Sequence, residues 1–394
     1  MTAVLKNSGY DQAALVAAVK SVLPETRPLP LHEPEFIGRE QEYVKDCIET
    51  GWVSSVGAYV DKFEELVAEK SGTRFAVACM NGTAALHIAL VVAGVGRDDE
   101  VLVQDLTFVA SANAVHHAGA IPHFVDSERE TLGLDPDALD AHLSEVAELR
   151  DGGAFNRATG RRIAAVVPMH VFGHPVRMER LAEVAARWNI PVVEDAAESL
   201  GSTRNGRLMG SYGMLASVSF NGNKTITTGG GGAVVTDDES LARRLKHLTT
   251  TAKLPHRWAF DHDEIAYNYR LPNLNAALGC AQMEMLDRFL AEKRALAALY
   301  RDAVADIPEV EFFDEPEGCE SNFWLNAVLV PDRAARDALL ETLNADGIQA
   351  RPCWTLMHEL PFNRDCPRAR LDVTGELVDR IVNLPSSAKL GRRS

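Results

Sequence analysis

Between residues 36 and 245, short apolar runs alternate with amphipathic stretches. The run FAVAC (75–79) predicts a buried strand, and in the stretch after it Ala85, Ile88 and Val92 share one helical face. The other apolar runs that we interpret as strands lie at 100–104, 121–126, 163–171, 190–195, 217–220 and 232–237. Continuous apolar strands that alternate with helices indicate a largely parallel sheet covered on both faces.

Three segments depart from this alternation. Residues 12–23 predict a separate helix followed by a Pro-rich linker, and the polar, Gly-containing segment 149–162 predicts a surface loop. Thr236 and Glu239 have the spacing of a capping box for the helix that follows. We therefore expect an N-terminal helix and linker at 1–35, then a large α/β domain at 36–250.

From about residue 246 the pattern changes to that of a smaller α+β domain, which we place at 251–394. It predicts one long helical stretch at 274–304, a strand at 321–330, a helix that ends at Gly347, and a strand at 348–353.

Composition and charge narrow the possible partners. The chain has 394 residues and a formal net charge of −16, which argues against nucleic acid or an anionic membrane as the main partner. The N-terminus lacks a signal peptide pattern, and no apolar run is long enough to span a membrane. Six scattered cysteines without metal-ligand spacing are typical of reduced thiols. We expect a cytoplasmic protein with no metal site.

Candidate chemistry lies where predicted strands end. The turn Asn81-Gly82-Thr83 precedes a helix, so its N–H groups and hydroxyl suit a phosphate, although an ordinary helix cap explains the same residues. Asp195 closes a buried strand, where a carboxylate needs a cationic or donor partner. A protonated pyridine nitrogen, a helix N-terminus and a metal ion all remain possible partners.

Two further residues follow strands in the same way. Lys224 lies between a strand and the glycines 229–232, where desolvation favours a nucleophilic amine; a solvated surface lysine is the alternative. Phe108 follows the strand at 100–104 and suits either stacking on a flat ligand or packing in the core.

The order of these residues along the chain, with the stretches around them, resembles the DegT/StrS family of nucleotide-sugar aminotransferases, which depend on pyridoxal 5′-phosphate (PLP). The resemblance covers roughly residues 30–385. The matching stretches are GWVSSVGAYVDKFEE (51–65), NGTAALHIAL (81–90), VLVQDLTFVASANAV (101–115), PMHVFGHPV (168–176), EDAAESLGS (194–202), SFNGNKTITTGGGGAV (219–234) and YNYRLPNLNAALG (267–279).

The resemblance implies the PLP-dependent transferase fold of type I, with a mostly parallel seven-stranded sheet between helices. It implies that Lys224 holds the cofactor as a Schiff base and shuttles protons, while Asp195 pairs with the pyridine nitrogen. By the same resemblance, Phe108 stacks on the ring and the phosphate ligands are Gly82, Thr83, Ser219 and, from the neighbouring subunit of a homodimer, Asn268. Glu198 lies in a cofactor motif without a defined role. The residues in motifs that surround the sugar are Trp52, Ser54, His170 and Arg270.

The implied reaction is transamination of a nucleotide-linked 4-keto-6-deoxy sugar with L-glutamate as amino donor. The N-terminal helix, the 149–162 segment and RPCWTLMHELP (351–361) favour a UDP-linked N-acetylated sugar, UDP-2-acetamido-2,6-dideoxy-hexos-4-ulose. The alternative is a GDP-4-keto-6-deoxymannose 4-aminotransferase similar to perosamine synthases. A PLP-dependent sugar dehydratase and a non-catalytic nucleotide-sugar-binding regulator are the remaining hypotheses.

Overall fold

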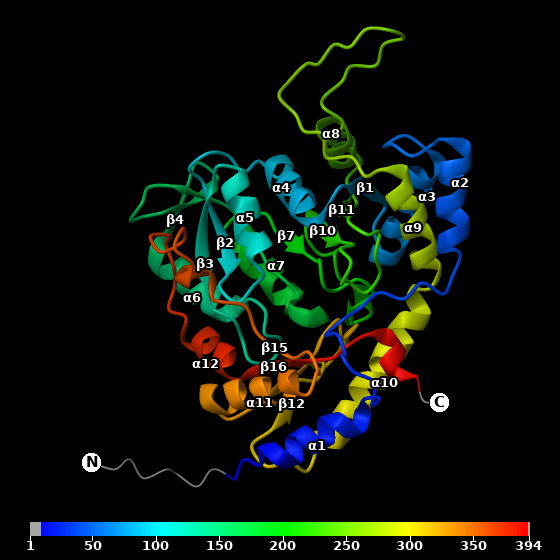
Figure 1. Cartoon of the computed structure of the whole chain (residues 1–394). Coiled ribbons are helices and arrows are strands. Elements are labelled where there is room, and N and C mark those ends of the chain that lie inside the picture. Colours follow the sequence, from blue (N-terminus) through cyan, green and yellow to red (C-terminus); the bar gives the residue numbers. More distant parts are fainter. Residues whose placement is uncertain (1–8, 393–394) are drawn as a thin grey trace.

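The structure is a computed structural model that describes residues 9–392. A sheet of seven strands forms its centre, in the order β1-β11-β10-β7-β6-β2-β3 (Figure 1). Parallel bridges at Val166–Val192 and Met169–Asp195 join β6 to β7. Only β11 runs antiparallel to its neighbours. The strands are β1 (Phe75–Cys79), β2 (Glu100–Gln104), β3 (Ile121–Val125), β6 (Arg162–Val167), β7 (Val193–Asp195), β10 (Leu215–Ser219) and β11 (Gly232–Thr236).

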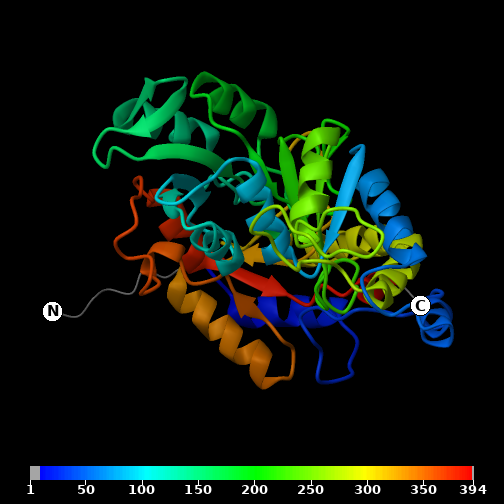
Figure 2. The ribbon, with the colours of Figure 1, turned by 90° about the horizontal axis from the view of Figure 1, so that it is seen from above.

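Helices cover both faces of this sheet, as the apolar runs predict (Figure 2). Successive strand residues point to opposite faces of the sheet. On one face, Val77 and Val103 pack with α4, α5 and α8. On the other face, Ala78 packs with α3 and α9, and Leu102 packs with α6 and α7. The helices are α3 (Ala58–Ser71), α4 (Gly82–Val92), α5 (Val109–His117), α6 (Pro136–Val146), α7 (Met178–Arg187), α8 (Glu239–Thr249) and α9 (Asn273–Glu284). The mostly parallel seven-stranded sheet between helices is thus confirmed.

The C-terminal part contains a second, antiparallel sheet in the order β12-β14-β16-β15. The N-terminal helix α1 (Gln12–Val22) packs into its core, where Leu15 and Val19 join Leu296, Tyr300 and Leu339. The two ends of the described chain therefore share one apolar cluster. The elements are β12 (Glu311–Phe312), β14 (Asn326–Leu329), β15 (Arg351–Pro352), β16 (Ile381–Leu384), α10 (Leu286–Val304), α11 (Arg333–Ala345) and α12 (Asp372–Arg380).

The remaining elements are short or peripheral. Helix α2 joins the cluster around α9 through Tyr43 and Cys47, and three two-residue strands form a small sheet in the order β13-β8-β9. These elements are α2 (Glu40–Thr50), β8 (Thr203–Arg204), β9 (Arg207–Leu208), β13 (Cys319–Glu320) and the 3-10 helices η1 (Val171–Gly173), η2 (Met357–Glu359) and η3 (Ala388–Gly391).

Segment 149–162 is not the plain loop that its polarity suggests. It folds back as a hairpin of β4 (Ala147–Arg150) and β5 (Gly153–Asn156), and β5 pairs with the start of β6. Asp151 and Gly152 both have positive φ, 51° and 80°, as a tight two-residue hairpin turn requires. The Asp-Gly pair was the available signal for this turn.

Three further local predictions are wrong. Asp238, rather than Thr236, caps α8, because its carboxylate accepts from the N–H groups of Ser240 and Leu241; the Thr236 hydroxyl donates instead to the carbonyl of Met214. The stretch 274–304 is two helices, α9 and α10, interrupted at Met285. The strand expected at 348–353 shortens to the two residues of β15.

Among residues 9–392, none of the helices has both the length and the apolar character needed to cross a membrane.

Candidate active site

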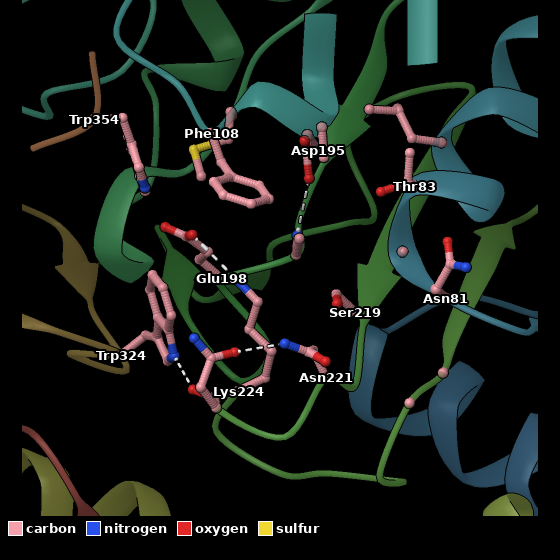
Figure 3. A pocket seen from close by; sticks show the side chains of 18 residues that line it. Asn81, Thr83, Phe108, Asp195, Glu198, Ser219, Asn221, Lys224, Trp324 and Trp354 are labelled. Carbon is pink, nitrogen blue, oxygen red and sulfur yellow. Dashed lines mark hydrogen bonds and ion pairs between the residues drawn. The ribbon is translucent and has the colours of Figure 1, made fainter. Parts of the chain in front are cut away.

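A cavity of about 320 Å³ opens at the carboxyl ends of the parallel strands, where open α/β sheets bind their ligands. Seven of the residues predicted from the sequence line it: Gly82, Thr83, Phe108, Asp195, Glu198, Ser219 and Lys224. They come from the ends of β7 and β10, from the beginnings of α4 and α5, and from the turns that follow (Figure 3).

The N-terminus of α4 forms one end of the cavity. Asn81 caps the helix, its side-chain oxygen accepting from the N–H of Ala84 at 2.8 Å. A side chain at Gly82 would lie 2.7 Å from Cβ of Ser219, so only glycine lets the helix approach β10 this closely. The first N–H groups of a helix have no partner within it and carry the positive end of its dipole. With the Ser219 hydroxyl, they make this end suitable for an anion.

Asp195 lies at the end of β7 and is buried. Its carboxylate accepts from Ser111 Oγ at 2.7 Å and from the N–H of Ala197 at 3.2 Å. Burial raises the pKa of Asp195, and these two hydrogen bonds oppose the rise. Among residues 9–392 no cationic side chain forms an ion pair with it. A buried carboxylate of this kind is suited to a cationic or protonated group bound in the cavity.

Lys224 lies in the turn after β10, where its N–H donates to the carbonyl of Asn221. Its Nζ lies 3.1 Å from Glu198 Oε1 and 3.9 Å from the centre of the Trp324 ring. The Lys224 side chain is only 13% exposed. Glu198 and Trp324 therefore fix the amine from two sides, one through charge and the other through a cation–π contact.

Glu198 is buried behind Lys224, and its second oxygen accepts from the N–H of Phe172 at 2.9 Å. Phe172 has φ of 55°, a conformation uncommon for a bulky residue that persists only when its surroundings hold it. Burial raises the pKa of Glu198 to about 7, although the charge of Lys224 and the Phe172 N–H act against the rise. The carboxyl group can therefore change protonation near neutral pH, beside the amine.

Phe108 is 47% exposed at the mouth of the cavity. Its ring lies 6.2 Å from that of Trp354, which in turn lies 5.3 Å from Phe172. Trp354 and Trp324 belong to the C-terminal part of the chain, so both halves of the molecule form the cavity wall.

Sequence reasoning missed both tryptophans. Trp324 Nε1 donates to the carbonyl of Asn223 at 2.7 Å, across 101 positions of sequence. The aromatic residues in SNFWLNAVLV and RPCWTLMHELP were the only available signal, and a strand or loop tryptophan is usually part of the core. Asn221 and Asn223, inside a motif used for the resemblance, also line the cavity and were not singled out.

Five predicted residues do not line the cavity. His170 is fully buried, with Nε2 3.1 Å from Glu194 Oε2 and Nδ1 accepting from the N–H of Val176. Both ring nitrogens thus have partners inside the fold.

The other four lie around the outside of the cavity. Arg270 donates to the side-chain oxygen of Asn268 at 3.1 Å, next to β1. Trp52, 56% exposed, and Ser54 belong to a loop whose carbonyls accept from Asn273 of α9.

Comparison with known proteins identifies the family of the chain. The sequence pattern of the DegT/DnrJ/EryC1/StrS aminotransferase family matches residues 34–394. The chain belongs to this family.

Relatives within the family match nearly end to end. GDP-perosamine synthase of Escherichia coli O157:H7 is 35% identical over 92% of this chain and 94% of its own length. GDP-perosamine synthase of Caulobacter vibrioides is 37% identical over 91% and 92%. A crystal structure of DesI in the presence of its TDP-sugar product superposes with a TM-score of 0.80, at 31% identity, over 91% of this chain and 88% of that one.

The fold is accordingly that of the type I PLP-dependent transferases, and the chain is a PLP-dependent aminotransferase. The cavity fits this cofactor on two observations. A buried Asp195 without an ion-pair partner suits a protonated pyridine nitrogen, and the N-terminus of α4 beside Ser219 suits a phosphate.

Proposed function

We propose that this enzyme transfers the amino group of L-glutamate to the keto group of a nucleotide-linked 4-keto-6-deoxy sugar, and that Lys224 is its catalytic lysine. The position of the Lys224 amine carries the proposal. It is held by Glu198 and Trp324 in the same cavity as the buried Asp195 and the N-terminus of α4.

Different residues of the cavity would bind different parts of PLP. Asp195 would hold the pyridine nitrogen, Gly82, Thr83 and Ser219 the phosphate, and Phe108 one face of the ring. When bound through Lys224, the cofactor supplies an electron sink for the carbon that gains or loses the amino group. The hydrogen bonds from Ser111 and the N–H of Ala197 favour the charged form of Asp195, which would keep the pyridine nitrogen protonated.

Lys224 would serve as the base of the reaction. When not bonded to the cofactor, its Nζ would be the amine of the cavity that takes a proton from the Cα of the amino donor and, in the second half of the cycle, gives a proton to the sugar carbon. Glu198, 3.1 Å from Nζ and with a pKa of about 7, would hold the lysine in position and exchange protons with it.

For the sugar nucleotide, we propose GDP-4-keto-6-deoxymannose. The segments that favoured a UDP-linked N-acetylated sugar are an N-terminal helix that packs into the C-terminal core, a β-hairpin at the sheet edge, and the loop of Trp354. In contrast, similarity to two GDP-perosamine synthases extends over nine-tenths of the chain. The UDP-linked sugar remains the second candidate, because the stretch 351–361 that favoured it contributes Trp354 to the cavity lining.

We also propose that the active enzyme is a homodimer in which each cavity receives Asn268 from the other copy. Asn268 and Arg270 lie outside the cavity lining of their own chain. The segment 251–266 next to them extends away from the body (Figure 1) and exposes Trp258, Phe260 and Ile265, by 73%, 75% and 93%. Large exposed apolar side chains on one arm are typical of a protein–protein contact.

A substrate panel tests the proposed reaction. The purified enzyme, loaded with PLP and supplied with L-glutamate, is incubated with the GDP-linked and the UDP-linked 4-keto sugars, and 2-oxoglutarate and the mass of the sugar nucleotide are measured. We expect glutamate-dependent replacement of the keto oxygen by an amino group, fastest with the GDP-linked sugar. Dehydrated sugar without consumption of glutamate, or no reaction with any keto sugar, contradicts the proposal.

A further inference from the structure

Lys293 of α10 is a buried lysine that the proposed reaction does not use. Its side chain is fully buried, and Nζ contacts three groups: the carbonyls of Ser386 at 2.6 Å and Trp324 at 3.1 Å, and Nε2 of His32 at 3.0 Å. None of these three partners is a carboxylate. Burying an amine without a counter-ion is costly, so the contacts that it makes have to compensate.

The three partners come from distant parts of the chain. His32 belongs to the linker after α1, and Ser386 follows β16; the two segments are joined directly, because the N–H of Ser386 donates to the carbonyl of Leu31 at 2.7 Å. Trp324 precedes β14 and reaches into the active-site cavity. Lys293 thus connects the linker, the end of β16 and the cavity wall.

The Trp324 residue itself is held at three points. Its N–H donates to the side-chain oxygen of Asn322 at 2.8 Å, its indole N–H donates to Asn223, and its carbonyl accepts from Lys293. The indole face that results lies 3.9 Å from Nζ of Lys224. Of the three anchors, Lys293 is the one that comes from helix α10.

The protonation states of the buried pair agree with these contacts. Burial lowers the pKa of Lys293 to about 7 and that of His32 well below its usual value, with the charge of Lys293 contributing to the second shift. Below about pH 7 the protonated amine has three N–H groups for three acceptors, with a neutral imidazole accepting at Nε2; above it, the neutral amine still donates to the two carbonyls. Nδ1 of His32 has no partner among the described residues.

We propose that Lys293 is a positioning residue of the active site, which fixes the Trp324 indole against the Lys224 amine by holding the Trp324 carbonyl, the Ser386 carbonyl and the His32 ring. This proposal rests on the role proposed above for Lys224. An aromatic face stabilises a positive charge on the nitrogen in front of it. Lys293, through Trp324, therefore holds this aromatic face in front of the Lys224 nitrogen, which also contacts the carboxylate of Glu198.

The experiment follows the pH titration of the absorbance of the lysine-bound cofactor in holoenzyme variants. We expect Trp324→Leu to lower the spectroscopic pKa by about one pH unit, since a desolvated cation–π contact is worth about that much. Lys293→Met should lower it in the same direction, by about half a unit or more on the same basis. The double variant should show no larger shift than Trp324→Leu alone, because both changes act on the same contact, the one between the Trp324 ring and the Lys224 nitrogen.

Two further variants complete the design. Lys293→Gln keeps two N–H donors for the carbonyls, so it should fold even where the methionine variant does not, with a smaller shift in the same direction. Lys389→Met is the matched control: Lys389 is a partly exposed lysine that pairs with Glu33 on the same linker, and its loss should leave the spectroscopic pKa unchanged.

A merely structural Lys293 gives a different result. In that case its variants lower the midpoint of thermal unfolding but leave the spectroscopic pKa at the wild-type value, or shift it additively with Trp324→Leu; either outcome overturns the proposal. Failure of the role proposed for Lys224 is distinguishable, since the wild-type protein with PLP then shows no lysine-bound chromophore, or shows one that persists in Lys224→Ala.

Discussion

The wall of the cavity and the surface around it are built in different ways. On the wall, the charged side chains have partners inside one chain: Asp195 has Ser111 and Ala197, and Lys224 has Glu198. Around the outside, Trp52 and the arm at 251–266 expose apolar surface to solvent. The charged side chains of the wall are held within one copy, whereas the outer surface has the character of an interface. This difference indicates which residues act alone and which act with a second chain.

On the cavity wall, the largest effect is expected at Lys224. Replacing Lys224 by Ala should reduce turnover by about 10⁴-fold, at the upper end of what a positioned base contributes. Lys224→Arg is the control, because it keeps the charge beside Glu198 but has no amine that can release its proton at neutral pH. Rapid-mixing measurements of the half-reaction with L-glutamate give both rates. Substantial turnover by either variant would show that another residue is the base.

Asp195→Asn should reduce turnover by about 10²-fold, an effect comparable to the loss of one preorganised electrostatic contact. The amide oxygen can still accept from the N–H of Ala197, and the amide NH2 can donate to the Ser111 hydroxyl, so the fold is retained while the charge is lost. The control is Ser111→Ala, which removes one donor to Asp195 and should have the smaller effect. Equal losses in the two variants would mean that Asp195 acts through its hydrogen bonds and not through its charge.

On the outer surface, Asn268→Ala should weaken PLP binding by about tenfold, as expected for one hydrogen bond to a charged group. Mixing Asn268→Ala with Lys224→Ala chains should then restore activity above the sum of the two, because a mixed dimer contains one intact cavity. No gain on mixing contradicts a shared site.

The arm should give an effect of similar size, on the association of the two chains. Replacing Trp258 by Ser should raise the dissociation constant of the dimer by about tenfold or more, since a buried aromatic anchor is commonly worth over 1 kcal/mol. Sedimentation velocity over a range of concentrations measures it. Phe362→Ser, a change at another exposed aromatic residue, should leave the dimer unaffected. A similar rise of the dissociation constant in both variants would show that the arm is not part of the dimer interface.

The smallest expected effect concerns stability and pH at Lys293. Its pKa is about 7 in the folded chain, against 10.5 for an ordinary lysine. Between these values the unfolded chain binds the extra proton, so this group makes the folded state more stable as pH rises. The free energy of unfolding of the wild type, relative to Lys293→Met, should therefore increase by about 1 kcal/mol from pH 7 to pH 8. A difference that is flat or falls with pH contradicts the buried neutral amine.

The residues of the cavity wall are easier to predict from the sequence than the contacts that hold them. The strands and the residues at their ends are predictable, because a parallel sheet brings its carboxyl ends to one edge and so gathers Gly82, Asp195 and Lys224. The place of Trp324 in the cavity wall is not predictable from the sequence. It depends on a contact with Asn223 across 101 positions, and the spacing of apolar residues does not encode such a contact. The capping box at Thr236 fails because the strand extends to that residue and uses its hydroxyl elsewhere.

His170 and Asn268 mark two other limits. A histidine in a motif does not reveal that both its ring nitrogens are bonded inside the fold, to Glu194 and Val176. Asn268 has a role that depends on a second copy of the chain, so neither its sequence position nor the fold of one copy tests it.

The central claim is that Lys224 binds the cofactor. Borohydride reduction of the PLP-loaded enzyme fixes the cofactor to its lysine, and proteolysis with mass spectrometry then locates the modified residue. We predict a single pyridoxyl group on the peptide that contains Lys224, and none after prior conversion with L-glutamate. A label on another lysine, Lys293 included, or no label on a protein that still transaminates, would contradict the account.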